Sequence, residues 1–127
     1  MNIQQELTKY ISLALQKELP KKTQIKTRFH LLDTIVSILT GRLLPPGKKA
    51  FYFSKQQGGI KESTLLGNDI KVSAINAGFS NGMAAHANET DDSHTKGRFH
   101  PGCAIIPTTI AIAEKQNLDS DNIIKAI

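Results

Sequence analysis

The sequence has few of the features that define several large protein classes. Only one of its 127 residues is a cysteine, Cys103, so no disulfide can form within the chain and a reduced, cytoplasmic setting is expected. No run of about 18 apolar residues is present, which argues against a membrane-spanning helix. The stretch before Pro20 contains no arginine, no basic segment leading into an apolar run and no small-residue cleavage site. Neither a secretory signal nor a transit peptide is therefore expected.

A nucleic-acid-binding motif is also missing, although the formal net charge is +5. The lysines are scattered, apart from short groups at residues 19–28 and 47–49, and no aromatic residues alternate with them. A solvated basic face is the better interpretation, so we expect no nucleic-acid partner and no membrane partner. The same positive charge favours the approach of an anionic substrate.

The apolar periodicity predicts one mainly helical domain. Helical spacing runs over residues 4–19, where Pro20 ends it, and over residues 23–42, where Gly41 and the sequence LPP at 44–46 end it. In the second of these segments Phe29, Leu32, Ile35, Val36 and Leu39 form a stripe that is expected to be buried. Further helices are predicted from Ser73, after the HPG sequence at 100–102, and from Asp119 or Ser120, with Ser73 and Asp119 or Ser120 as N-caps.

Residues 50–67 differ from the rest of the chain. The sequences AFYFS (50–54) and STLLG (63–67) indicate short extended pieces, separated by a glycine-containing linker. A hairpin around Gly58 and Gly59 and an irregular connection are both compatible with this pattern. The helix expected from Ser73 onward is instead rich in glycine and alanine, which predicts that neighbouring helices approach its backbone closely.

The most unusual segment lies between two helices that the pattern predicts to be buried. Residues 86–100 hold three of the four histidines and three of the eleven acidic residues. His86 and Glu89 are three positions apart, which places them on one face if the helix continues. His100 precedes Pro101, a residue favoured at the start of a helix. The free N–H groups of a helix start bind carboxylates, and a histidine there suits proton transfer near neutral pH.

Structural roles are the alternative for each of these residues, since carboxylates at helix ends are often caps. A metal site is a further alternative, because His86, Asp92, His94 and His100 are suitable ligand types. Their spacing matches no zinc motif, so no metal and no cofactor are expected. Cys103 is expected to be a buried, inert thiol on an apolar helix face.

The order of four segments resembles the N-terminal part of the MmgE/PrpD family. These segments are LLDTIVSILTGR (31–42), GGIKESTLLG (58–67), NGMAAHANETDDSH (81–94) and HPGCAIIPTTIAIAE (100–114). The resemblance extends from about residue 5 to residue 127 and implies that residues 1–127 are the N-terminal part of an all-helical domain. Family members also have the rest of that domain and an α/β lid, which are absent here, and they are commonly dimers.

The resemblance also implies a chemistry. Family members include 2-methylcitrate dehydratase, cis-aconitate decarboxylase and iminodisuccinate epimerase, which act next to a carboxylate on small di- or tricarboxylic acids without a metal. It implies His100 as a catalytic residue, with Asp91 and Asp92 shaping the site. It implies that Glu89 and Ser93 contact the substrate, at positions where the decarboxylase branch has Asp and Thr. His86 and His94 are the other two residues predicted to bind substrate.

Three functions therefore stay open from the sequence. The first is the N-terminal portion of a lyase or isomerase, expected to be inactive as an isolated chain. The second is a truncated or split-gene helical chain without catalysis, and the third is a small metal-dependent hydrolase. In the first two cases we expect a homodimer or a second chain that completes the site.

Overall fold

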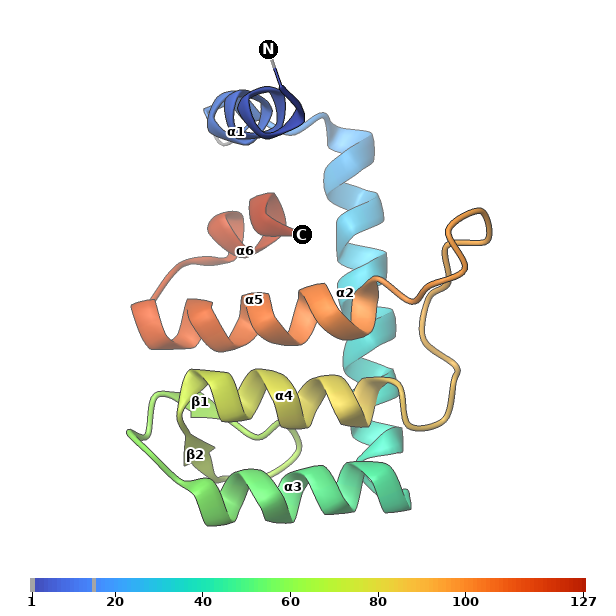
Figure 1. The fold of residues 1–127 in the computed structure, drawn as a ribbon, viewed down its shortest axis with the longest axis vertical. Helices are drawn as coiled ribbons and strands as arrows, with labels where there is room; N and C mark the ends of the chain where they lie inside the picture. The colour runs from blue at the N-terminus through green and yellow to red at the C-terminus, as the bar shows by residue number, and fades with distance from the viewer. Residues whose placement is uncertain (1, 15) are drawn as a thin grey trace.

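The computed structural model describes residues 2–14 and 16–127, and it confirms a mainly helical fold (Figure 1). Within these residues there are six helices and one antiparallel pair of short strands. Their bounds are α1 Ile3–Ala14, α2 Lys21–Gly41, α3 Pro45–Gln57, β1 Ser63–Thr64, β2 Lys71–Val72, α4 Ala74–Ala85, α5 Gly102–Gln116 and α6 Ser120–Ala126. In the part of the chain that the structure describes, no helix combines the length and the apolar character needed to cross a membrane.

Helix α4 is the centre of the fold, lying between α3 and α5 while α2 crosses the layer (Figure 1). Its small side chains permit this, because Ala77 and Ala85 are fully buried. A Cβ added at Gly82 would lie only 2.9 Å from the carbonyl oxygen of Cys103 on α5. The close helix approach predicted from the glycine and alanine content is thus confirmed, and it brings the end of α4 beside the start of α5.

The crossing of α2 over α4 depends on another small residue. A Cβ at Gly41 would overlap the backbone carbonyl of Ala84. The side of α2 that faces the domain otherwise carries small or polar residues, including the buried Thr34 and Ser37 together with Ile38. This surface lets the two helix backbones meet almost in contact.

The helix ends largely follow the sequence signals. The Ser73 side chain accepts a hydrogen bond from the backbone N–H of Asn76, and Asp119 does the same for Asn122, so both predicted N-caps are confirmed. Helix α2 ends at Gly41, as expected. The first helix is shorter than the predicted 4–19, because α1 ends at Ala14, and Leu15 lies outside the described residues.

The prediction for residues 50–54 was wrong. AFYFS lies inside α3, which begins with Pro45 and Pro46 in its first turn and buries Ala50 and Ser54. Proline suits a first helical turn because the N–H it lacks has no partner there. The hairpin around Gly58 and Gly59 is wrong as well, since the strand pair joins Ser63–Thr64 to Lys71–Val72.

The short sheet is fastened to α5 by polar side chains. The Ser63 hydroxyl donates to the carbonyl of Ala111 over 2.6 Å, and Glu114 accepts from both the backbone N–H and the hydroxyl of Thr64, each over 2.6 Å. Burial alone would raise the pKa of Glu114, but the Thr64 hydrogen bonds and the nearby Lys71 ammonium outweigh it and lower that pKa. These bonds fix the segment between α3 and α4 against α5.

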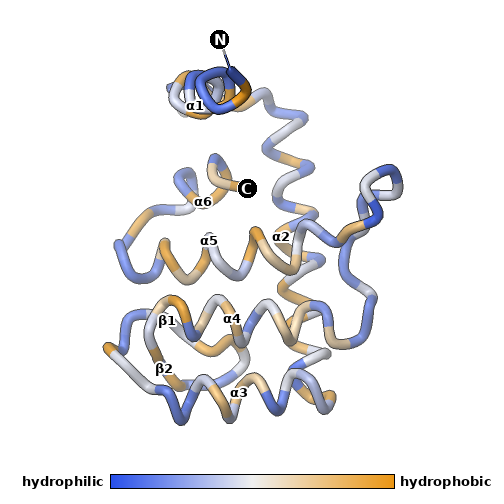
Figure 2. The backbone as a smooth tube through the Cα atoms, in the orientation of Figure 1, coloured by the Kyte–Doolittle hydropathy of each residue, from blue (hydrophilic) through white to orange (hydrophobic). Residues whose placement is uncertain are grey.

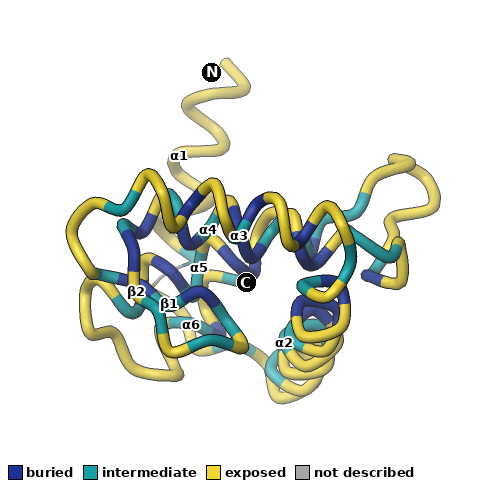
Figure 3. The backbone as a smooth tube through the Cα atoms, turned by 90° about the horizontal axis from the view of Figure 1, so that it is seen from below, coloured by how far each residue is buried: buried dark blue, intermediate teal, exposed yellow. Residues whose placement is uncertain are grey.

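Four of the five residues in the apolar stripe on α2 are exposed, contrary to the prediction that the stripe is buried, and only Ile35 is partly buried. Phe29 is 67% exposed, Leu32 60% and Val36 51%. Figure 3, in which α2 is seen nearly end-on, shows that its exposed side is turned away from the other helices. The reason is that close contact with α4 selects the small, polar side of α2, which leaves its bulky side outside the domain.

Candidate functional site

The polar segment between α4 and α5 forms a long excursion from the helical layer, and it is hydrophilic over much of its length (Figure 2). Its outer part is a small turn closed by a bridge between His94 and Phe99. The His94 ring stacks on Phe99, and its Nδ1 accepts a hydrogen bond from the N–H of Gly97 over 2.9 Å. His94 is exposed and lies apart from His86 and His100, and it lines a pocket that His30 and Asp92 also line.

The inner part of the segment places a buried carboxylate between two imidazoles. The side chain of Asp91 is fully buried, and its oxygens lie 3.2 and 3.3 Å from Nδ1 of His86, which immediately follows α4. Nδ1 of His100 lies 3.4 Å from Oδ1 of the same carboxylate. The two rings are 4.8 Å apart between centroids. Three residues predicted for the site are therefore brought together.

The Asp91 carboxylate sets the orientation of its neighbours. An ionised carboxylate only accepts hydrogen bonds, so Nδ1 of His86 carries the proton and Nε2 is left as the basic atom. His86 is about half exposed, with 47% of its side-chain surface accessible, so that basic atom is open to a ligand. Nδ1 of His100 is buried and has no hydrogen-bond partner among the described residues. A general base needs a basic atom that a substrate can reach, which here is Nε2 of His86.

The adjacent Asp92 has a different role. Its Oδ1 accepts from the N–H of Gly102 over 2.8 Å at the start of α5, and its Oδ2 lies 3.3 Å from Nδ1 of His30. A Cβ at Gly102 would overlap the Asp92 carboxylate and crowd the Thr34 hydroxyl, so this position needs a glycine. The helix start that was predicted to bind a substrate carboxylate is thus capped by the carboxylate of Asp92.

His30 belongs to this region but was not predicted from the sequence. It lies on α2, far along the chain from the polar segment. The available signal was its position one turn before Thr34, a buried residue on the face of α2 that contacts the domain. Two polar residues one turn apart on the face of a helix that contacts the domain indicate a polar neighbour, which for His30 is the Asp92 side chain.

Glu89 and Ser93 lie outside the buried cluster. Helix α4 ends at Ala85 and Glu89 has a positive φ of 52°, so the prediction that it shares a helix face with His86 was wrong. Its side chain is exposed. Ser93 is also exposed and lines a pocket of about 310 Å³ together with Lys26, His30 and Asp92. This pocket lies on the Asp92 side of the acidic pair.

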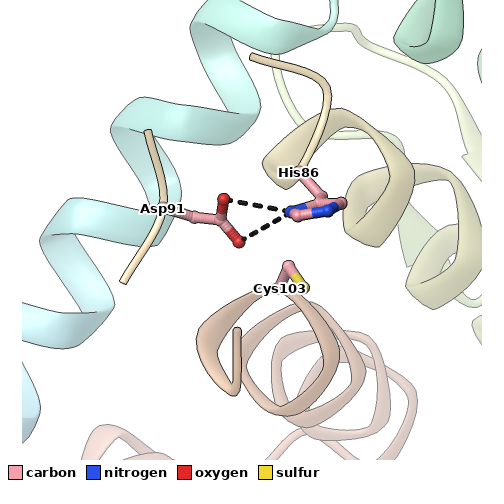
Figure 4. Close-up of side chains that lie close together, drawn as sticks. All are labelled: His86, Asp91 and Cys103. Carbon is pink, nitrogen blue, oxygen red and sulfur yellow. Dashed lines mark hydrogen bonds and ion pairs between the residues drawn. The ribbon is translucent and has the colours of Figure 1, made fainter. Parts of the chain in front are cut away.

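Cys103 lies in the first turn of α5, close to His86 and Asp91 (Figure 4). Its thiol donates to the carbonyl oxygen of His100 over 3.1 Å. Burial, followed by the nearby Asp91 carboxylate, raises the pKa of the thiol to about 11. Cys103 is therefore protonated and weakly nucleophilic at neutral pH, as predicted. It is partly buried, and it packs against the apolar cluster of Ile38, Ala84 and Ala85 while also lying near the Asp91 carboxylate.

The four residues that the sequence offered as metal ligands are not brought together. His86 and His100 flank Asp91, whereas Asp92 faces His30 and Gly102, and His94 lies in the outer turn. The ligand set His86, Asp92, His94 and His100 therefore does not form a site in this structure. A small metal-dependent hydrolase built on those four residues is not supported.

Fold and site together define a helical protein with a histidine–carboxylate cluster at the junction of two closely packed helices. The model of the MmgE/PrpD N-terminal domain matches residues 5–127, nearly the whole chain, and the chain belongs to this family. Comparison with the curated proteins gave no match, and comparison with the solved structures gave none.

Proposed function

We propose that the chain supplies acid–base groups of a lyase or isomerase that acts beside a carboxylate on small di- or tricarboxylic acids, as 2-methylcitrate dehydratase does. Membership of the MmgE/PrpD family supports a lyase-like role. The observation that carries the proposal is the buried Asp91 carboxylate held between His86 and His100. No metal is needed for this chemistry, and the single cysteine is compatible with a cytoplasmic setting.

The roles follow from the positions of the side chains. Asp91 is a positioning residue that orients the His86 ring and lies 3.4 Å from Nδ1 of His100. We assign the two rings to proton exchange with the carbon or oxygen next to the substrate carboxylate. The pocket of about 310 Å³ on the Asp92 side suits a small polycarboxylate, and Lys26 and His94 are among the residues that line it. His86, Asp91 and His100 do not line this pocket, so a substrate bound there has to reach from it toward the two rings. Ser93 and His30, also in the pocket lining, supply hydrogen-bond donors for carboxylate oxygens.

Exchange of a single substrate proton tests this function. The isolated chain is expected to be inactive in the complete reaction, but exchange of one proton needs only the acid–base groups and a bound substrate. Incubated in heavy water with citrate, 2-methylcitrate or cis-aconitate, the chain is therefore expected to exchange a proton next to a carboxylate, followed by proton NMR. His100→Gln should lower this rate by roughly 100-fold or more, the range of general acid–base catalysis. Ile75→Gln, at an exposed position on α4, is the surface control and should keep the rate.

Two results would argue against the proposal. An unchanged rate in His100→Gln would remove His100 from the reaction. A wild-type chain that exchanges no substrate proton would favour the non-catalytic helical chain. Circular dichroism of each variant shows whether helix content is kept.

We further propose that the chain forms a homodimer through the exposed stripe on α2. Its members alternate at spacings of four and three residues, the heptad pattern of a coiled-coil seam; they are Ile25, Phe29, Leu32, Val36, Leu39 and Leu43. In a parallel pair Arg28 of one copy faces Asp33 of the other, at the flanking heptad positions. An antiparallel pair would instead place Arg28 opposite Arg42, which is repulsive, so we assign the parallel arrangement.

Sedimentation velocity tests this dimer. Leu32→Lys should convert a dimer to a monomer, because it puts a charge in the centre of an apolar seam. Ile75→Lys adds the same charge at an exposed position on another helix and should leave the dimer intact. A wild-type monomer, or a dimer that survives Leu32→Lys, would point to a different interface or to a second chain that covers α2.

A further inference from the structure

We propose that His86, Asp91 and Cys103 form a binding site for a divalent transition-metal ion of the zinc type. One donor atom from each residue lies within 4.8 Å of the other two. Figure 4 shows the three side chains converging from the end of α4, the polar segment and the first turn of α5. The sequence did not suggest this set, because it has Asp91 and Cys103 in place of Asp92, His94 and His100.

The distances are close to those of a tetrahedral site. Zinc bonds of about 2.0–2.3 Å place neighbouring donor atoms roughly 3.3–3.7 Å apart. Nδ1 of His86 and the Asp91 oxygens are already 3.2 and 3.3 Å apart. All three donor atoms lie within 4.8 Å of one another, so binding requires side-chain rotations that shorten the longest of these distances by no more than about 1.5 Å.

The surroundings hold two of the ligands and leave the third accessible. Asp91 is buried with no exposed side-chain surface, and Cys103 is fixed by the close approach of its carbonyl to Gly82. His86, at 47% side-chain exposure, provides the route by which an ion enters. Nδ1 of His100 lies 3.4 Å from Asp91 Oδ1 but does not join the group of three donor atoms, so solvent water would fill the fourth position of a tetrahedral site.

The donor types select the metal. A thiolate, an imidazole and a carboxylate together suit Zn²⁺ or Co²⁺, whereas Mg²⁺ and Ca²⁺ prefer oxygen ligands alone. On binding, the metal–sulfur bond replaces the S–H bond of Cys103 and that proton goes to solvent. The His86 ring keeps one proton, which moves from Nδ1 to Nε2.

Such an ion would inhibit the reaction assigned to this site, and that consequence rests on the proposed function. It would take the Asp91 oxygens and the imidazole of His86 away from proton transfer. Metal binding itself does not depend on the proposed function, so the two are tested separately.

Cobalt titration of the chain, freed of metal with a chelator, is the direct test. We expect one Co²⁺ per chain, with a thiolate-to-cobalt charge-transfer absorption that added Zn²⁺ abolishes. Cys103→Ser should remove that absorption and weaken cobalt binding by roughly 100-fold or more. Loss of a residue that only hydrogen-bonds to a metal ligand usually costs less than this. His94→Ala removes a histidine of the same segment that is not a ligand, and it should bind cobalt as the wild type does.

A second variant guards against misfolding of Cys103→Ser. His86→Gln alters a half-exposed side chain, so the fold should persist while cobalt affinity falls by a similar factor. The proposal is overturned if wild-type protein gives no thiolate–cobalt absorption, or if His86→Gln binds as tightly as wild type. If the proposed function is correct, Zn²⁺ should also inhibit proton exchange. If the chain exchanges no substrate proton, the cobalt titration still tests the metal site by itself.

Discussion

Gly41→Ala is expected to destabilise the chain by about 3 kcal/mol, the cost of overpacking a close contact. The added methyl group would overlap the backbone carbonyl of Ala84, where α2 crosses α4. A flexible side chain could rotate away, but a carbonyl within a helix can move only with its helix. Relief of the clash would therefore shift α2 relative to α4, and the buried Ile38 and Ala85 beside the crossing would lose contacts.

The matched control is a second glycine inside a helix. A Cβ at Gly78 would meet Thr108 at 3.6 Å or more, which is ordinary van der Waals distance. Gly78→Ala should therefore stabilise the chain by up to about 1 kcal/mol, the helix-propensity difference between the two residues. Urea unfolding followed by far-UV circular dichroism measures both variants. If both variants changed the free energy of unfolding in the same direction, the contact assigned to Gly41 would be wrong.

The elements that could be predicted from sequence are those that local chemistry determines. Ser73 and Asp119 cap helices because their side chains reach backbone N–H groups only three residues away. The close packing of α4 followed from its composition, since only small residues let two backbones meet. The helix over 45–57 was missed because its aromatic residues suggested a strand, whereas the two prolines that begin it favour a helix start.

The face that α2 presents to the domain could not be predicted from apolar periodicity. Large apolar residues usually face a core, but close contact with α4 needs the small residues on the opposite side. The same limit applies to the site. Nearness along the chain was enough to group His86, Asp91 and His100, but not to find His30, whose contact with Asp92 depends on how α2 packs.

Asp91 and Asp92 are neighbours in sequence, yet their asparagine variants are expected to behave in opposite ways. Asp91→Asn should change the ring protonation of His86, because the amide group of asparagine donates where the carboxylate can only accept. The fraction of His86 with its proton on Nδ1 should fall, which long-range proton–nitrogen NMR of the imidazoles reports without any substrate. If the proposed function holds, proton exchange should fall by roughly 100-fold as well.

Asp92→Asn should leave the protonation of His86 unchanged, and Asp92→Ala, which removes the acceptor for the N–H of Gly102, should lower stability by about 1 kcal/mol, a typical cost for losing a helix cap. The reason is that Asp92 accepts from Gly102 at the start of α5 and contacts His30 on α2, so it joins two helices rather than orienting the site. Thermal unfolding by circular dichroism measures this loss. The roles assigned to Asp91 and Asp92 would be wrong if Asp92→Asn shifted the His86 tautomer. They would also be wrong if Asp91→Asn left that tautomer unchanged. The difference arises from the turn between the two residues, which directs Asp91 toward His86 and His100 and Asp92 toward the start of α5.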